Sequence, residues 1–273
     1  QIDMGEGDDE TIGGDGLSAT IREVREDTTI KAMVLRVNSP GGSALASDVI
    51  WREVVLTKQR IPVIVSMGDV AASGGYYISC PADVIVANPT TITGSIGVFG
   101  LLWNGQKMLN DHLGVTMDGV ETNTGAGVGN FTRPMSEMER NYFQKSVERV
   151  YDVFIGHVSS GRKISKADVD SVGQGRVWSG INAKEIKLVD ELGGLERAID
   201  IAKEKAGITT EARIIEFPKK LPFFEQIMKE IEGKSETRIQ EELGDSYTFY
   251  KAIRNVRRMN GIQARIPYEI CIY

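Results

Sequence analysis

The sequence predicts an α/β domain with a largely parallel sheet and a helical arm, because strand, turn and helix patterns repeat along its first part. Short apolar runs rich in β-forming residues predict buried strands, at 30–37, 62–67 and 83–87, with a strand-like run at 97–103. A glycine-rich turn at 38–43 separates the first strand from helical spacing over 44–58. Strand–helix units at this spacing imply right-handed crossovers between parallel strands.

The second part of the chain predicts the arm. Residues 121–134 are polar and glycine-rich and indicate a long loop. One long amphipathic helix then runs from Ser136 to about Gly161, with Ser136 as its N-cap and Glu139 at the capping-box position. Two further helices are expected, at 164–172 and 195–206.

The remaining residues predict a C-terminal extension packed on the same domain. Its expected elements are a strand at 213–217, one or two helices and a final strand from Gly261. We therefore divide the chain into a domain at 1–206 and an extension at 207–273.

Composition excludes several classes of protein. The 32 basic and 38 acidic residues give a net charge of −6, so nothing favours a nucleic-acid partner. Cys80 and Cys271 form no CxxC pair, and no run approaches the ~18 apolar residues of a transmembrane helix. The chain starts at Gln1 with an acidic, glycine-rich stretch. We interpret it as a fragment whose membrane anchor lies upstream.

The two histidines, His112 and His157, offer little chemistry. Neither has a second histidine or cysteine at metal spacing, so we expect no metal site. A Ser-His-Asp triad would need one of them, but the chain lacks the GxSxG turn typical of such hydrolases. The glycines at 125–129 do not sit between a buried strand and a helix, so they indicate a flexible loop and no nucleotide or other cofactor.

Ser73 is the candidate nucleophile. It follows a buried strand and precedes Gly74 and Gly75, which would let a substrate backbone approach its hydroxyl. A helix beginning there would direct free backbone N–H groups, that of Gly74 included, at a developing oxyanion. The glycines of the 38–43 turn could expose another N–H. The alternative is that both segments are only tight strand–helix turns.

Four blocks of sequence resemble the signal peptide peptidase A family of serine/lysine-dyad proteases. They are RVNSPGGS at 36–43, MGDVAASGGYY at 67–77, ANPTTITGSIGV at 87–98, and GRVWSG at 175–180 with the downstream LVDELG at 188–193. The resemblance covers about residues 12–205 and implies the Clp protease/crotonase fold. It also implies that Ser73 is the nucleophile, that the N–H groups of Gly42 and Gly74 form the oxyanion hole, and that the Ser95 hydroxyl orients a lysine amine.

The sequence departs from the one-repeat members of this family at the lysine. In those members the lysine lies in the loop before the long helix, where this chain has Ala126 or a near neighbour. No lysine occurs between Lys107 and Lys145. Two-repeat members place the serine in the C-terminal repeat and the lysine in the N-terminal one. The chain resembles that C-terminal repeat, so we expect its general base to come from an upstream repeat.

The resemblance also implies partners and a location. It implies cleaved signal peptides and other hydrophobic peptides as substrates, a ring-like homo-oligomer such as a tetramer, and a bacterial membrane enzyme with a periplasmic or extracytoplasmic catalytic domain. A neutral lysine base requires burial or a nearby positive charge to lower its pKa. Two alternatives stay open: a catalytically silent scaffold repeat and a crotonase-type acyl-CoA enzyme.

Overall fold

The computed structural model describes residues 1–8, 11–123, 125–218 and 247. The described strands are β1 (Ile2–Asp3), β2 (Ile12–Gly13), β3 (Met33–Ser39), β4 (Val63–Ala72), β5 (Val84–Ala87), β6 (Ile92–Gly94), β7 (Val177–Ser179) and β8 (Glu191–Leu192). The described helices are α1 (Gly14–Glu26), α2 (Ala44–Lys58), α3 (Gly74–Ser79), η1 (Met108–His112), α4 (Glu137–Arg162), α5 (Lys166–Val172), α6 (Gly180–Glu185) and α7 (Leu195–Lys205).

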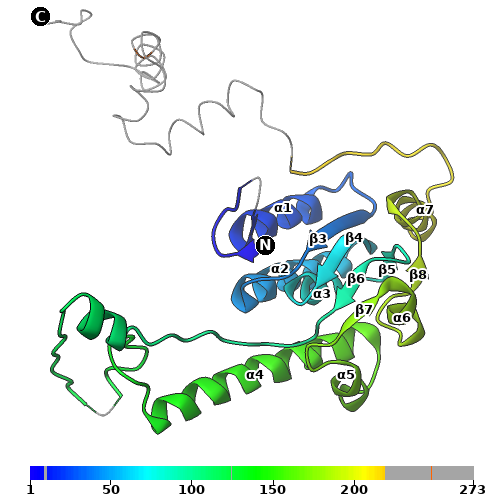
Figure 1. Cartoon of the computed structure of the whole chain (residues 1–273). Coiled ribbons are helices and arrows are strands. Elements are labelled where there is room, and N and C mark those ends of the chain that lie inside the picture. Colours follow the sequence, from blue (N-terminus) through cyan, green and yellow to red (C-terminus); the bar gives the residue numbers. More distant parts are fainter. Residues whose placement is uncertain (9–10, 124, 219–246, 248–273) are drawn as a thin grey trace, which may run out of the picture. The chain divides into compact units, whose positions relative to one another are not determined.

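The central strand β4 organises the main sheet (Figure 1). Strand β3 pairs with β4 in parallel, β5 pairs with its first half and β6 with its last three residues, also in parallel. Strand β8 extends the sheet beyond β5 in parallel, and β7 pairs with β6 in the antiparallel direction. The prediction of an α/β domain with a largely parallel sheet is therefore confirmed.

Helices cover the sheet and bury its apolar residues. Helix α7 packs on β3, β4 and β5, where Ile64 and Val86 cluster with Ala198 and Ile201. Helix α2 packs between α1 and α3. Its predicted range of 44–58 is confirmed, and Ser43 caps it by accepting a hydrogen bond from the Ala46 N–H.

The arm is built from α4 and the chain that precedes it (Figure 1). The predicted capping box is present: the Ser136 hydroxyl accepts from the Glu139 N–H, and the Glu139 carboxylate accepts from the Ser136 N–H. The C-terminal part of α4 is buried in the domain through Phe154, Ile155 and Val158. The arm, in contrast, exposes many large apolar side chains. These include Phe99, Leu101, Trp103, Leu113, Met117, Val120 and Tyr142.

Two expectations from the sequence were wrong. Residues 97–103 form no strand, because no strand among the described residues pairs with this apolar run, and Phe99 is 91% exposed. Residues 213–217 have no regular secondary structure either. The sequence patterns also did not indicate helix α1, which begins at Gly14. A Cβ on that glycine would lie only 3.0 Å from Ala46 Cβ, so the glycine allows α1 to approach α2 closely.

The chain divides into two compact units, Gln1–Ile214 and Ile215–Tyr273. The boundary that we placed at 206/207 and the packing of the extension stay predictions, and the extension's helices and final strand lie outside the described residues. Among the described residues, no helix combines the length and the apolar character needed to span a bilayer.

The stability of the N-terminal end of α4 should fall in acid, because Glu139 loses its charge there. Hydrogen bonds from Arg133, at 2.8 and 2.9 Å, and from the Ser136 N–H lower the pKa of Glu139 to about 2. Because this pKa is depressed on folding, its stabilising effect is present above the ordinary carboxyl pKa of 4.5 and is lost as the pH falls towards 2. An NMR titration should give a Glu139 midpoint near 2, raised in Arg133→Gln. An ordinary midpoint in the unmodified protein would contradict this ion pair.

Candidate active site

Ser73 occupies a sharp turn between β4 and α3. Its backbone has φ 53° and ψ −117°, a conformation that residues with a Cβ rarely adopt. Two hydrogen bonds hold this turn: the Ser73 N–H donates to the Gly94 carbonyl at 2.9 Å, and the Ser73 carbonyl accepts from the Tyr77 N–H at 2.8 Å. The Ser73 side chain makes no hydrogen bond to any described residue, so its hydroxyl is available for chemistry.

The loop after β3 packs directly against this turn. Gly41 has φ 103°, and a Cβ there would lie 2.7 Å from the Gly74 nitrogen and 2.9 Å from Ser73 Cβ. Only glycine therefore lets the two loops approach each other. The sequence had indicated Gly42 but not this contact of Gly41. The paired glycines of the 38–43 turn were the signal that could have identified it.

The N–H groups of Gly42 and Gly74 lie beside each other. Strand β1 pairs with this loop through the Gly41 carbonyl and the Ser43 N–H, each 2.9 Å from its partner atom on Ile2, so the Gly42 N–H points away from β1. A Cβ on Gly74 would lie 3.2 Å from the Gly42 nitrogen. Among the described residues, neither N–H donates a hydrogen bond to a backbone carbonyl in the turns and loops. Two N–H groups in this arrangement can donate together to a developing oxyanion.

A bulge in β4 brings the strand to this point. The β3–β4 register shifts between Val37 and Ser39, opposite the stretch that begins at Gly68. The Asn38 side chain accepts from the Val70 N–H at 3.1 Å and so satisfies a backbone group that the bulge leaves without a ladder partner. Sequence reasoning had treated Asn38 only as a turn residue.

Ser95 lies next to the Ser73 turn, because Gly94 is the residue that accepts the Ser73 N–H. Ser95 also has a positive φ, of 47°, and its N–H donates to the Arg176 carbonyl at 2.7 Å. The next pair in this register, Gly175 N–H to the Ile96 carbonyl, measures 2.9 Å. The structure therefore places Ser73, Gly42, Gly74 and Ser95 near one another, and the roles that the sequence assigns to them stay predictions.

The histidines do not complete a triad with Ser73. His157 Nε2 lies 3.2 Å from Asp48 Oδ1, and its ring stacks on Trp51. His112 is exposed in η1. Burial raises the pKa of the Cys80 thiol to about 12, which makes Cys80 unsuitable as a nucleophile.

No general base stands at Ser73 in the described part of the chain. None of its lysines donates a hydrogen bond to Ser73 or Ser95; Lys58 and Lys166, for example, pair with Asp83 and Asp152. The described part of the 121–134 loop lies at the outer end of the arm (Figure 1). The described residues also contain no cluster of metal-ligating side chains.

The strain at Ser73 should appear in stability measurements. Ser73→Gly removes the Cβ at this positive φ, whereas Ser73→Ala keeps it. After the entropy that glycine adds to the unfolded chain, Ser73→Gly should be more stable than Ser73→Ala by about 1 kcal/mol. Chemical denaturation of both variants measures the difference. A less stable glycine variant would show that the turn is not strained.

Comparison with known proteins identifies the family. The family model for peptidase family S49 matches residues 56–209. Protease 4 of Haemophilus influenzae is 42% identical over 214 residues, which cover 78% of this chain and 34% of the relative. Protease 4 of Salmonella typhi is 45% identical over 196 residues, covering 71% of this chain and 31% of the relative.

A plant relative and a solved structure extend the comparison. The chloroplastic serine protease SPPA of Arabidopsis thaliana is 42% identical over 195 residues, 71% of this chain and 29% of the relative. A ClpP1 mutant from Listeria monocytogenes is similar with a TM-score of 0.46 and 15% identity, over 68% of this chain and 86% of that chain. The chain spans about a third of the length of these three curated relatives. It belongs to peptidase family S49.

Proposed function

We propose that this chain is the serine-bearing part of a signal peptide peptidase, an endopeptidase with a Ser/Lys dyad. The observation that carries the proposal is the strained turn at Ser73, which lies beside the N–H groups of Gly42 and Gly74. No described residue forms a hydrogen bond with the Ser73 hydroxyl. A free hydroxyl next to two converging donors fits acyl transfer, because the donors can bind the oxyanion as it forms.

In the proposed first step, Ser73 Oγ attacks the carbonyl carbon of the scissile peptide bond. The hydroxyl proton passes to a neutral lysine amine as the C–O bond forms. The carbonyl oxygen becomes an oxyanion, which the N–H groups of Gly42 and Gly74 stabilise. Loss of one such donor typically lowers kcat by about 10²–10³-fold, so this pair supplies a large part of the rate.

In the second step the lysine returns the proton to the leaving amine, the C–N bond breaks and an acyl-enzyme on Ser73 remains. Water then attacks the acyl group, with the lysine again accepting a proton, and hydrolysis regenerates Ser73. In this proposal Ser95 accepts a hydrogen bond from the lysine amine and so orients it. Its fixed backbone, tied to Arg176, supports that role.

The proposed lysine belongs to an N-terminal repeat upstream of this chain. Two observations support this origin: the 121–134 loop contains no lysine, and no described lysine donates a hydrogen bond to Ser73 or Ser95. The chain on its own would then hold a nucleophile and an oxyanion hole without a general base.

The proposed substrates are cleaved signal peptides and similar hydrophobic segments. Such a peptide would lie extended at the Gly42 loop, with its backbone paired to strand edges there. Exposed apolar side chains follow two of the site segments in sequence and support an apolar substrate. Leu45, just after the Gly42 loop, is 62% exposed, and Phe99, just after Ser95, is 91% exposed.

The proposed enzyme is a ring-like homo-oligomer such as a tetramer, held at a bacterial membrane by a segment outside this chain, with its site on the periplasmic or extracytoplasmic side. The apolar arm supports assembly, because soluble proteins rarely leave so many large apolar side chains in water. The assembly would also bring the lysine-bearing repeat to Ser73.

Labelling with a fluorophosphonate probe tests the proposal. The probe reacts with an activated serine, so we expect rapid labelling of the chain assembled with its upstream repeat and little labelling of the chain alone. Ser73→Ala should abolish the labelling. Ser160→Ala, which changes an exposed serine on α4, is the matched control and should label as the unmodified protein does.

The other outcomes separate the alternatives. Rapid labelling of the chain alone would mean that the base lies within it, and would contradict the split dyad. No labelling in either form would contradict the protease and leave the silent scaffold or the acyl-CoA enzyme, which a coenzyme A titration distinguishes.

A further inference from the structure

Three helices meet close to the proposed oxyanion hole, a short distance further along α2 and α3. They contribute Asp48 from α2, Tyr77 from α3 and His157 from α4. The Tyr77 hydroxyl donates to Asp48 Oδ1 at 2.7 Å, and His157 Nε2 lies 3.2 Å from the same oxygen. Sequence analysis had singled out His157 as a remote triad candidate, and the function described above does not use it.

The two N–H groups of the hole belong to different helices. The Gly42 N–H lies just before Ser43, the N-cap of α2, and the Gly74 N–H begins α3. The separation of the two donors therefore depends on how α2 and α3 pack. At their N-terminal ends they touch through small groups, since a Cβ on Gly74 would lie 2.6 Å from Ser47 Oγ.

The Tyr77–Asp48 hydrogen bond joins these two helices. Within the described part of the chain, it is the sole side-chain hydrogen bond between α2 and α3. Burial and the neighbouring Asp48 carboxylate raise the pKa of Tyr77, so the hydroxyl keeps its proton and remains a donor. The Tyr77 ring packs on Phe154 at 4.6 Å between centroids, which fixes its orientation.

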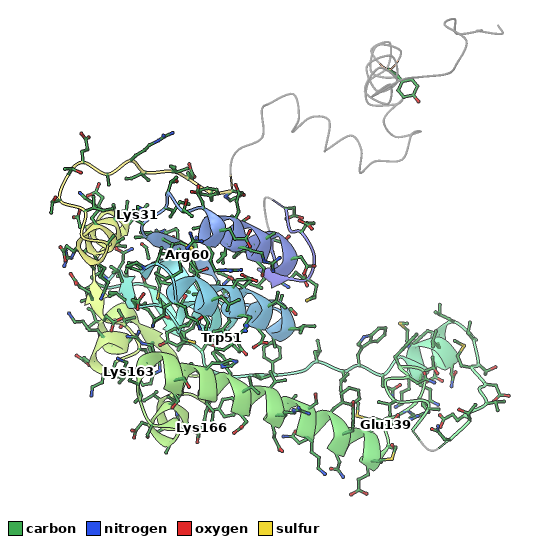
Figure 2. All side chains as sticks on the ribbon, turned by 180° about the vertical axis from the view of Figure 1, so that it is seen from behind. Lys31, Trp51, Arg60, Glu139, Lys163 and Lys166 are labelled. Atoms are coloured by element: carbon green, nitrogen blue, oxygen red, sulfur yellow. The ribbon has the colours of Figure 1, made fainter. Side chains whose placement is uncertain are left out.

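His157 connects the same carboxylate to the arm helix. Its ring stacks on Trp51 at a centroid distance of 3.6 Å and an interplanar angle of 20°, and it meets the Tyr77 ring edge at 5.4 Å. Trp51 belongs to α2, and Figure 2 shows it between α2 and α4. The C-terminal part of α4 thus contacts both helices that carry the proposed oxyanion hole, α2 through Trp51 and α3 through Tyr77.

We propose that Asp48 is a positioning residue for the hydrolytic reaction: by holding Tyr77 and His157 together, it sets the separation of the Gly42 and Gly74 N–H groups and ties it to the arm helix. This inference rests on the proposed function. Asp48 itself touches neither substrate nor the reacting atoms. It acts through α2 and α3, so its removal should weaken transition-state stabilisation more than substrate binding.

The test compares Asp48→Ala, Asp48→Asn and Tyr77→Phe in the chain assembled with its upstream repeat. Asp48→Ala and Tyr77→Phe should lower kcat about 10-fold with KM nearly unchanged, a fraction of the loss on removing an oxyanion donor outright. Asp48→Asn should retain most of kcat, because its amide oxygen can still accept from Tyr77. Asp152→Ala and Asp200→Ala, which change exposed aspartates of α4 and α7, are the matched controls.

A second readout uses the chain alone and needs no catalysis. In ¹H–¹⁵N NMR spectra, Asp48→Ala and Tyr77→Phe should shift the Gly42 and Gly74 amide signals, and Asp48→Asn and the controls should not. Unchanged kcat and unchanged amide signals in Asp48→Ala would overturn the inference, as would a loss confined to KM. An unmodified assembly that cleaves no peptide would instead contradict the proposed function, and the amide signals would then decide the positioning role by themselves.

Discussion

The site depends on one backbone constraint, the positive φ of Ser73 at the end of β4. A β-strand that ran straight into a helix would bury the residue at the junction. At this turn Ser73 instead stays half-buried between the buried Ala72 and Gly74, while its N–H stays bonded to Gly94. This turn also starts α3 at Gly74, which frees the first N–H of the helix. Gly41 completes the arrangement, since any larger residue would strike the turn.

Much of this arrangement could be predicted from the sequence. Helix 44–58 and the capping box at Ser136 follow from local patterns, and local patterns place Ser73 between a strand and a glycine pair. The contacts that assemble the site could not be predicted in the same way. A pattern of apolar residues does not say whether a neighbouring strand exists, which is why 97–103 was wrongly expected to be a strand. The Asp48–Tyr77 pair joins residues that lie on different helices, and no local pattern indicates it.

The proposed site combines backbone donors that the fold holds in place with a general base that the described residues do not supply. The proposed oxyanion hole rests on backbone atoms of β3, β4 and their following helices, which the sheet and the Gly41 contact hold in place. Preorganised donors of this kind need little rearrangement during the reaction. The loop that carries the lysine in one-repeat members of the family, by contrast, contains no lysine here and lies at the end of an exposed arm. A nucleophile without its base would be inactive until the two parts meet, which would limit unwanted proteolysis by the isolated chain.

The most direct measurement is a crystal structure of the assembled enzyme with a peptidyl boronate bound to Ser73. The account predicts a boronate oxygen within about 2.7–3.1 Å of both the Gly42 and Gly74 nitrogens. It also predicts that the amine nearest Ser73 Oγ and Ser95 Oγ belongs to a lysine from outside this chain. A boronate oxygen turned towards solvent, or a base from this chain such as His157 at Ser73, would contradict it.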